Sequence, residues 1–136
     1  MRLQPLSHVD LSTPNGPMRT HLFRPVGEGK FPAVIFFAEI YQMTGPIARM
    51  AAILAGQGFL VAVPDVYHEF TELGEAFEYD KAGTDRGNKL KTTKELASYD
   101  ADARATISFL QSDPGCSGEI GVMGVCLADT LPFERP

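Results

Sequence analysis

The chain has 136 residues, a hydrophobic share of 44%, a net charge of −5 and a pI near 5.1. This length suits one globular domain with an ordinary core, so residues 1–136 are expected to form a single domain. The acidic balance argues against nucleic acid and anionic membranes as partners, because both need clustered Lys and Arg. Apolar runs stay well below the ~20 residues that cross a bilayer, and the N-terminus lacks an apolar signal core, so a cytoplasmic protein is expected.

The first third of the chain predicts two strands in a hairpin, a buried strand and a helix. Residues 9–11 and 18–23 alternate in polarity around the turn sequence Pro14-Asn15-Gly16-Pro17, which is typical of an antiparallel hairpin. Residues 33–38 are apolar on both faces, as in a strand inside a parallel sheet. An apolar stripe at helical spacing predicts a helix near 47–56.

The rest of the chain also predicts strands and helices in turn. Residues 59–63 predict a second buried strand, and 64–90 form a polar, glycine-dotted stretch that we interpret as a functional loop or lid. A long helix is predicted near 95–112 and a last strand at 119–124. Strand and helix in alternation imply an α/β fold with a mostly parallel sheet and an N-terminal β-hairpin.

A cysteine closely follows the last predicted strand. Cys126 stands in Gly124-Val125-Cys126-Leu127, the layout of a sharp strand-to-helix turn that pushes a nucleophile into a pocket. Ligands of open α/β sheets gather at the carboxyl ends of the strands, where this residue is expected. The pattern alone leaves a second interpretation open, because free cysteine is among the most buried residue types and Cys126 could simply pack behind the strand.

Glu39 is the second candidate, because it directly follows the six apolar residues 33–38 and is poorly solvated there. Taken alone, it is read as a helix-capping or loop acid. Next to Cys126, it could take the thiol proton when a substrate arrives, and the thiolate is the nucleophile. A nucleophile of this kind also needs a base, usually a later histidine, and none of the ten residues after Cys126 is histidine.

Other polar residues receive plainer interpretations. Asp65 is expected to fix its loop through hydrogen bonds from backbone groups, and His68 is a candidate base that is more simply solvated or structural. His8 and His21 are expected at the surface. Arg86 and Lys89 could meet an anionic substrate, although charged residues in loops are normally solvated.

The two cysteines are expected to act independently. Cys116 precedes the last strand and Cys126 follows it, roughly 25 Å away at strand spacing, whereas a disulfide needs Cα atoms within ~7 Å. Cys116 is interpreted as a loop cysteine. The spacings of zinc sites and of dinucleotide-binding loops are absent from the sequence, so neither metal nor cofactor is expected.

Three stretches together resemble the dienelactone hydrolase family, the cysteine branch of the α/β-hydrolases. They are Ala38-Glu39-Ile40-Tyr41, Val63-Pro64-Asp65-Val66-Tyr67-His68 and Gly121-Val122-Met123-Gly124-Val125-Cys126-Leu127. Their order and spacing match the first half of that family, so the resemblance covers nearly all of residues 5–127. It implies a truncated α/β-hydrolase fold and a cofactor-free hydrolase of carboxylic esters or lactones.

The resemblance also implies residue roles. Cys126 matches the nucleophile and Glu39 the acid that pairs with the resting thiol, while the backbone N–H groups of Ile40 and Leu127 match an oxyanion hole. Tyr41 and Arg86 are assigned to substrate binding. The catalytic aspartate and histidine of the family come later in its sequence, and no position here matches them.

Residues 128–136 depart from the family pattern, which continues Cys-Leu-Gly-Gly into an apolar helix. Pro132 and Pro136 do not fit such a helix. A frameshift after Leu127 is one explanation. Codons for residues 128–135 can be chosen among synonyms so that, with one base restored before them, they encode Gly-Gly-His-Leu-Ala-Phe-Arg-Ala. On this interpretation the chain is a truncated hydrolase of impaired or lost activity.

Two classes of function therefore stay open. One is an ester or lactone hydrolase, and the other is a non-catalytic remnant or a module that binds small acyl compounds in the same pocket. A thiol redox protein is disfavoured because no second cysteine could resolve an oxidised Cys126. Because the 119–124 strand is central in the complete fold, we also expect an open edge there and self-association through it.

Overall fold

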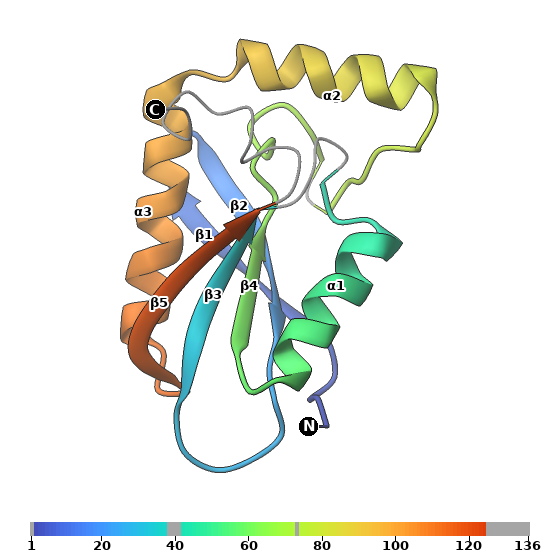
Figure 1. Cartoon of the computed structure of the whole chain (residues 1–136). Coiled ribbons are helices and arrows are strands. Elements are labelled where there is room, and N and C mark those ends of the chain that lie inside the picture. Colours follow the sequence, from blue (N-terminus) through green and yellow to red (C-terminus); the bar gives the residue numbers. More distant parts are fainter. Residues whose placement is uncertain (1, 38–41, 73, 125–136) are drawn as a thin grey trace, which may run out of the picture.

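The computed structural model describes residues 2–37, 42–72 and 74–124 (Figure 1). Within these ranges, one sheet has the strand order β1-β2-β4-β3-β5, and helices pack on both of its faces. The strands are β1 (Ser7–Thr13), β2 (Gly16–Phe23), β3 (Phe31–Phe37), β4 (Leu60–Pro64) and β5 (Cys116–Gly124). The helices are α1 (Gly45–Gly56), α2 (Lys81–Thr93) and α3 (Leu96–Ser112).

The predicted N-terminal hairpin is confirmed. Strands β1 and β2 pair antiparallel from Ser7–Leu22 to Thr13–Gly16, and β2 then pairs antiparallel with β4. Gly16 follows the turn with φ of 108°, a conformation that favours glycine. The hairpin thus adds two antiparallel strands, β1 and β2, to the sheet on the β4 side.

The parallel centre of the sheet is confirmed as well. Strand β3 pairs in parallel with β4 on one side and with β5 on the other. All five residues of β4 are buried, because alternate side chains enter two separate cores. Leu60 and Ala62 face the core that includes Tyr99 and Leu110 of α3, whereas Val61 and Val63 face the core that includes Ile47, Ala51 and Ala55 of α1.

The expectation of a structureless loop over 64–90 is wrong, because Lys81–Thr93 form helix α2. Asp80 caps it, accepting a hydrogen bond from the Gly83 N–H at 2.7 Å. The helix is almost entirely polar, and its buried residues are Gly83 and Gly87. A helix that contacts its neighbours through glycine has no apolar stripe, so hydrophobic periodicity could not reveal it.

Strand β5 forms an edge of the sheet in the described part of the chain, where it pairs with β3. Ile120 packs against the α3 core, but Val122 is 60% exposed and Met123 is 42% exposed. Cys116, interpreted above as a loop cysteine, is instead the buried first residue of β5. Among the described residues, no helix has the length and apolar character needed to cross a membrane.

Candidate active site at the carboxyl edge of the sheet

Two parallel strands, β3 and β5, end side by side, and each is followed in the sequence by a candidate segment. The ladder between β3 and β5 ends with Phe37 paired to Gly124, the last residue of each strand. Glu39 is two residues beyond Phe37 in the sequence, and Cys126 is two residues beyond Gly124. Both strands therefore end side by side, two residues before the predicted acid and the predicted nucleophile in the sequence.

Five of the predicted site residues lie outside the described residues. They are Glu39, Ile40, Tyr41, Cys126 and Leu127. Their roles stay predictions, and the described residues around the same edge define the setting in which they would act.

Gln42 is the first described residue after β3, and sequence reasoning did not single it out. Its φ is 65° and its side chain is buried. The amide oxygen accepts a hydrogen bond from the Tyr67 N–H at 3.0 Å, and Nε2 donates to the Glu75 carbonyl at 2.8 Å and to Thr71 Oγ1 at 3.5 Å. The sequence held no signal for this role beyond a polar residue between a strand and a helix.

The segment after β4 differs from expectation at its first residue. Asp65 is buried, and its carboxylate lies 3.1 Å from Nε2 of His21 in β2, where we expected a contact with loop backbone. The His21 side chain is only 12% exposed, so the prediction of a surface histidine is wrong, whereas His8 is exposed as expected. The pair of His21 and Asp65 connects the end of β4 to β2.

His68 is structural and belongs to a buried ion cluster. Its Nε2 lies 2.9 Å from Oδ1 of Asp102 in α3, and the other Asp102 oxygen pairs with the ammonium of Lys94 at 2.7 Å. Lys94 also pairs with Glu69 and donates to Ser98 Oγ at 2.7 Å. The cluster joins the loop after β4 to the end of α2 and the start of α3.

The cluster has the donor set of a metal site but already holds a cation. His68, Glu69 and Asp102 offer ligand atoms within 4.8 Å of one another. The Lys94 ammonium pairs with both carboxylates and supplies the positive charge there. Burial alone would raise the pKa of Glu69, but hydrogen bonds from Lys94 and Ser98 outweigh it and hold that pKa below its usual value.

Sequence analysis missed Lys94, Ser98 and Asp102, although the helix contained a signal. Ser98, Asp102 and Thr106 recur every fourth residue of α3 and are all buried. The prediction of this helix used its apolar stripe alone. A polar stripe at the same spacing beside it indicates a second buried face with hydrogen-bonding partners.

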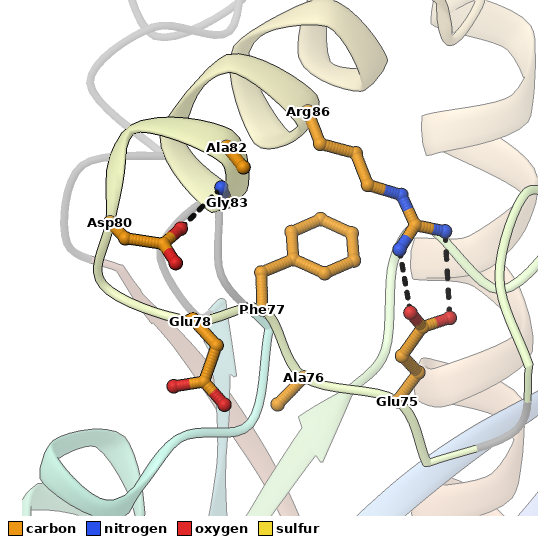
Figure 2. Close-up of a pocket in the computed structure, with 8 residues that line it drawn as sticks. All are labelled: Glu75, Ala76, Phe77, Glu78, Asp80, Ala82, Gly83 and Arg86. Carbon is orange, nitrogen blue, oxygen red and sulfur yellow. Dashed lines mark hydrogen bonds and ion pairs between the residues drawn. The ribbon is translucent and has the colours of Figure 1, made fainter.

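Arg86 lies in helix α2 at the wall of a small open pocket of about 260 Å³ (Figure 2). Its guanidinium donates to the Glu75 carboxylate at 2.6 and 3.5 Å and lies over the Phe77 ring, 4.6 Å from the centroid. The Arg86 hydrogen bond lowers the pKa of Glu75. Arg86 therefore lines a pocket, and its guanidinium already has an anionic partner. Lys89 is exposed.

The pocket lies at helix α2, beyond the carboxyl ends of the parallel strands. Figure 1 shows α2 crossing beyond the edge at which β3, β4 and β5 end. Glu75 links the two regions, because its carbonyl accepts from Gln42 and its carboxylate pairs with Arg86. The described contacts thus run from Gln42 through Glu75 to Arg86 in α2.

Comparison with known proteins agrees with this architecture. The model of the dienelactone hydrolase family matches residues 18–134. A Saccharomyces cerevisiae protein named "Putative carboxymethylenebutenolidase" is 41% identical over 123 residues, covering 86% of this chain and 44% of the relative. The carboxymethylenebutenolidase of Pseudomonas sp. (strain P51) is 31% identical over 122 residues, covering 88% of this chain and 50% of the relative.

Solved structures show the same fold. The crystal structure of the "Putative Dienelactone Hydrolase" from Klebsiella pneumoniae superposes with a TM-score of 0.76 at 20% identity, over 93% of this chain and 51% of that one. This chain spans about half the length of the relatives that it matches. Over the part that it spans, the chain has the α/β-hydrolase fold, and it belongs to the dienelactone hydrolase family.

Proposed function

We propose that this chain forms the nucleophile-bearing part of a hydrolase site for carboxylic esters or lactones, with Cys126 as the nucleophile. The observation that supports it best is the ladder pair Phe37–Gly124, since Glu39 and Cys126 each follow it by two residues. The family match and the names of the relatives support the same chemistry. We place the protein in the cytoplasm, as expected from the sequence.

The proposed reaction begins with transfer of the Cys126 thiol proton to Glu39. The thiolate attacks the carbonyl carbon, and the backbone N–H groups of Ile40 and Leu127 stabilise the oxyanion. Cleavage of the C–O bond releases the alcohol, which takes up the proton, and leaves a thioester on Cys126. Hydrolysis of that thioester by water needs a base, so we propose that this chain acylates faster than it deacylates and turns over slowly or not at all.

Arg86 and Tyr41 are proposed to bind the substrate. Arg86 is suited to a carboxylate on the substrate, because a guanidinium binds carboxylates in bidentate geometry. Its present partner Glu75 would have to give way to that carboxylate. A substrate with an anionic group should therefore bind best at low ionic strength.

Acylation by p-nitrophenyl acetate tests this proposal. We expect about one equivalent of p-nitrophenol per chain, with the acetyl group located on Cys126 by mass spectrometry. Cys126→Ala should abolish the acetylation, and Cys116→Ala, the matched change at a buried cysteine, should not. Binding without acetylation of Cys126 would favour the alternative of an acyl-binding module.

We further propose that the chain associates with itself through β5. The exposed Val122 and Met123 lie in a strand whose only described ladder is with β3. An apolar strand edge is a template for pairing with another chain.

A further inference from the structure

Asn15 lies at the tip of the N-terminal hairpin and is followed directly by glycine. Pro14 and Asn15 form the turn between β1 and β2, beyond the last ladder pair, which joins Thr13 to Gly16. Asn15 is exposed to solvent, and Gly16 has no side chain that would keep other atoms away from its backbone nitrogen. Asparagine is one of the thermolabile residue types, and this sequence and exposure favour its breakdown.

We propose that Asn15 is a site of spontaneous deamidation and that this modification detaches the hairpin tip from helix α3. The backbone nitrogen of Gly16 attacks the side-chain carbonyl carbon of Asn15. The side-chain nitrogen leaves as ammonia with the Gly16 amide proton, and a succinimide ring remains. Water then opens the ring at either carbonyl and returns a proton to the Gly16 nitrogen. The product is aspartate or isoaspartate, so a neutral amide becomes a carboxylate.

The Asn15 side chain makes a contact that its acid form cannot make. Its Nδ2 donates to Ser98 Oγ at 3.1 Å, which joins the hairpin tip to the start of α3. Ser98 Oγ also accepts from Lys94 Nζ at 2.7 Å and donates its one proton to Glu69 at 2.5 Å. A carboxylate has no proton to donate, and the Ser98 proton is already given to Glu69. Deamidation therefore removes this hydrogen bond without a replacement.

The new carboxylate would also lie near two others. Asn15, Glu69 and Glu95 line one open pocket of about 550 Å³ between the hairpin tip and the start of α3. Glu69 is paired with Lys94, whereas Glu95, the N-cap residue of α3, makes no side-chain cap hydrogen bond. A charge added beside carboxylates is repelled by them. We therefore expect the hairpin tip to move away from α3 and this pocket to widen.

Asn88, the other asparagine of the chain, is the internal control. It is exposed like Asn15, but Lys89 follows it and both residues lie within helix α2. The helix commits the backbone nitrogen of the next residue to a hydrogen bond with the preceding turn, and the Lys89 side chain shields that nitrogen. Asn88 should therefore remain an amide under conditions that convert Asn15.

The first experiment incubates the full chain in mildly alkaline buffer for days and maps its peptides by mass spectrometry. We expect the peptide with Asn15 to show the mass change from amide to acid, with both aspartate and isoaspartate present, before any change at Asn88. An intact Asn15 amide, or conversion of Asn15 and Asn88 at the same rate, would overturn the proposed modification site.

Three variants test the structural consequence. Asn15→Asp reproduces one product, Asn15→Ala removes the hydrogen bond to Ser98 without adding a charge, and Asn88→Asp adds the same charge to exposed α2. We expect Asn15→Asp to have the lowest urea midpoint and the least protected Ser98 amide, which bonds to the Glu95 carbonyl. Added salt should narrow its difference from Asn15→Ala, because salt screens repulsion between charges.

The same measurements can reject the detachment. Stability and protection of Asn15→Asp equal to or above those of Asn15→Ala would show that the new charge is accommodated at the hairpin tip. An equal loss in Asn88→Asp, or a difference that salt leaves unchanged, would show that repulsion inside this pocket is not the cause.

Discussion

His68 and its neighbours show how a site candidate can turn out to hold the structure together. The imidazole has a sequence position that suits a base, yet its Nε2 bonds to Asp102 inside a buried cluster. Asp102 in turn bonds to Lys94, which also bonds to Glu69. The cluster connects the loop after β4 to two helices, so its removal should affect stability.

We expect His68→Ala to lower the free energy of unfolding by about 1–3 kcal/mol, the cost of leaving a buried polar partner unsatisfied. Urea denaturation measures the change. His8→Ala is the matched control at an exposed position and should stay within about 0.5 kcal/mol of wild type.

The same variant tests the role of His68 in catalysis. Acylation of Cys126 should persist in folded His68→Ala and disappear in Cys126→Ala. Multiple turnovers that disappear only with the Cys126 change would contradict the absence of an efficient base for deacylation. Loss of turnover with both changes would make His68 that base.

The ion pair between Asp113 and Arg24 should make the free energy of unfolding depend on pH. Arg24 donates to both carboxylate oxygens at 2.8 and 3.0 Å, and this hydrogen bonding lowers the pKa of Asp113. A lowered folded-state pKa stabilises the protein above the unfolded value, about 3.9, and this contribution is lost as pH falls through the folded-state value.

Asp113→Asn should therefore lower the free energy of unfolding by about 1–2 kcal/mol near pH 7. The difference from wild type should shrink below about pH 4 and vanish once Asp113 is protonated in the folded state. Asp100→Asn, which breaks an exposed pair with Arg104, should change stability by less than about 1 kcal/mol. A difference for Asp113→Asn that stays constant down to pH 2 would contradict the pairing.

Apolar runs and stripes were sufficient signals for β3, β4, α1 and α3, because each buries hydrophobic side chains. The apolar run of β5 also predicted a strand, although Val122 and Met123 remain exposed. Helix α2 was missed because its buried residues are Gly83 and Gly87, which leave no apolar stripe in the sequence. The partners of Asp65, His21 and Asp102 were missed for a different reason. Each bonds to a residue distant in the sequence, and local patterns contain no information on such pairs.

The close packing at Gly83 should make the start of α2 sensitive to a larger side chain. A Cβ at this position would lie 2.0 Å from the Glu78 carbonyl oxygen, which is backbone and cannot rotate away. Gly83→Ala should therefore destabilise the start of α2, and we expect a loss of about 1–3 kcal/mol, the usual range for overpacking. Hydrogen exchange of the α2 amides reports it.

Gly121→Ala is the control for that experiment. Among the described residues beyond its two chain neighbours, no atom lies within 4 Å of a Cβ built at Gly121, so this change should leave α2 amides at the wild-type rate. Equal protection of α2 in Gly83→Ala and wild type would mean that the helix can shift away from Glu78 at no measurable cost.

At the scale of the whole molecule, the exposed edge at β5 should determine the state of association. We expect light scattering to show dimers or larger species. Val122→Lys should shift the chain toward monomer, because a charged side chain on an edge strand opposes pairing with another strand. Val122 is 60% exposed, so the lysine can be accommodated in the monomer.

Ile53→Lys is the matched control, since Ile53 is 68% exposed on α1 and lies outside the sheet. It should leave the association unchanged. A monodisperse wild-type monomer with strongly protected amides at 119–124 would contradict the open edge and would show that the chain covers it.

The ladder pair Phe37–Gly124 also determines the order in which the molecule assembles during synthesis. Strands β1 to β4 can pair as soon as residue 64 has left the ribosome, whereas β5 must close a loop back to β3 around both α2 and α3. Closing a loop of this length costs about 4 kcal/mol of chain entropy. The pairing of Phe37 with Gly124 is thus the last to form on the growing chain, and every earlier intermediate lacks the strand that precedes the predicted nucleophile.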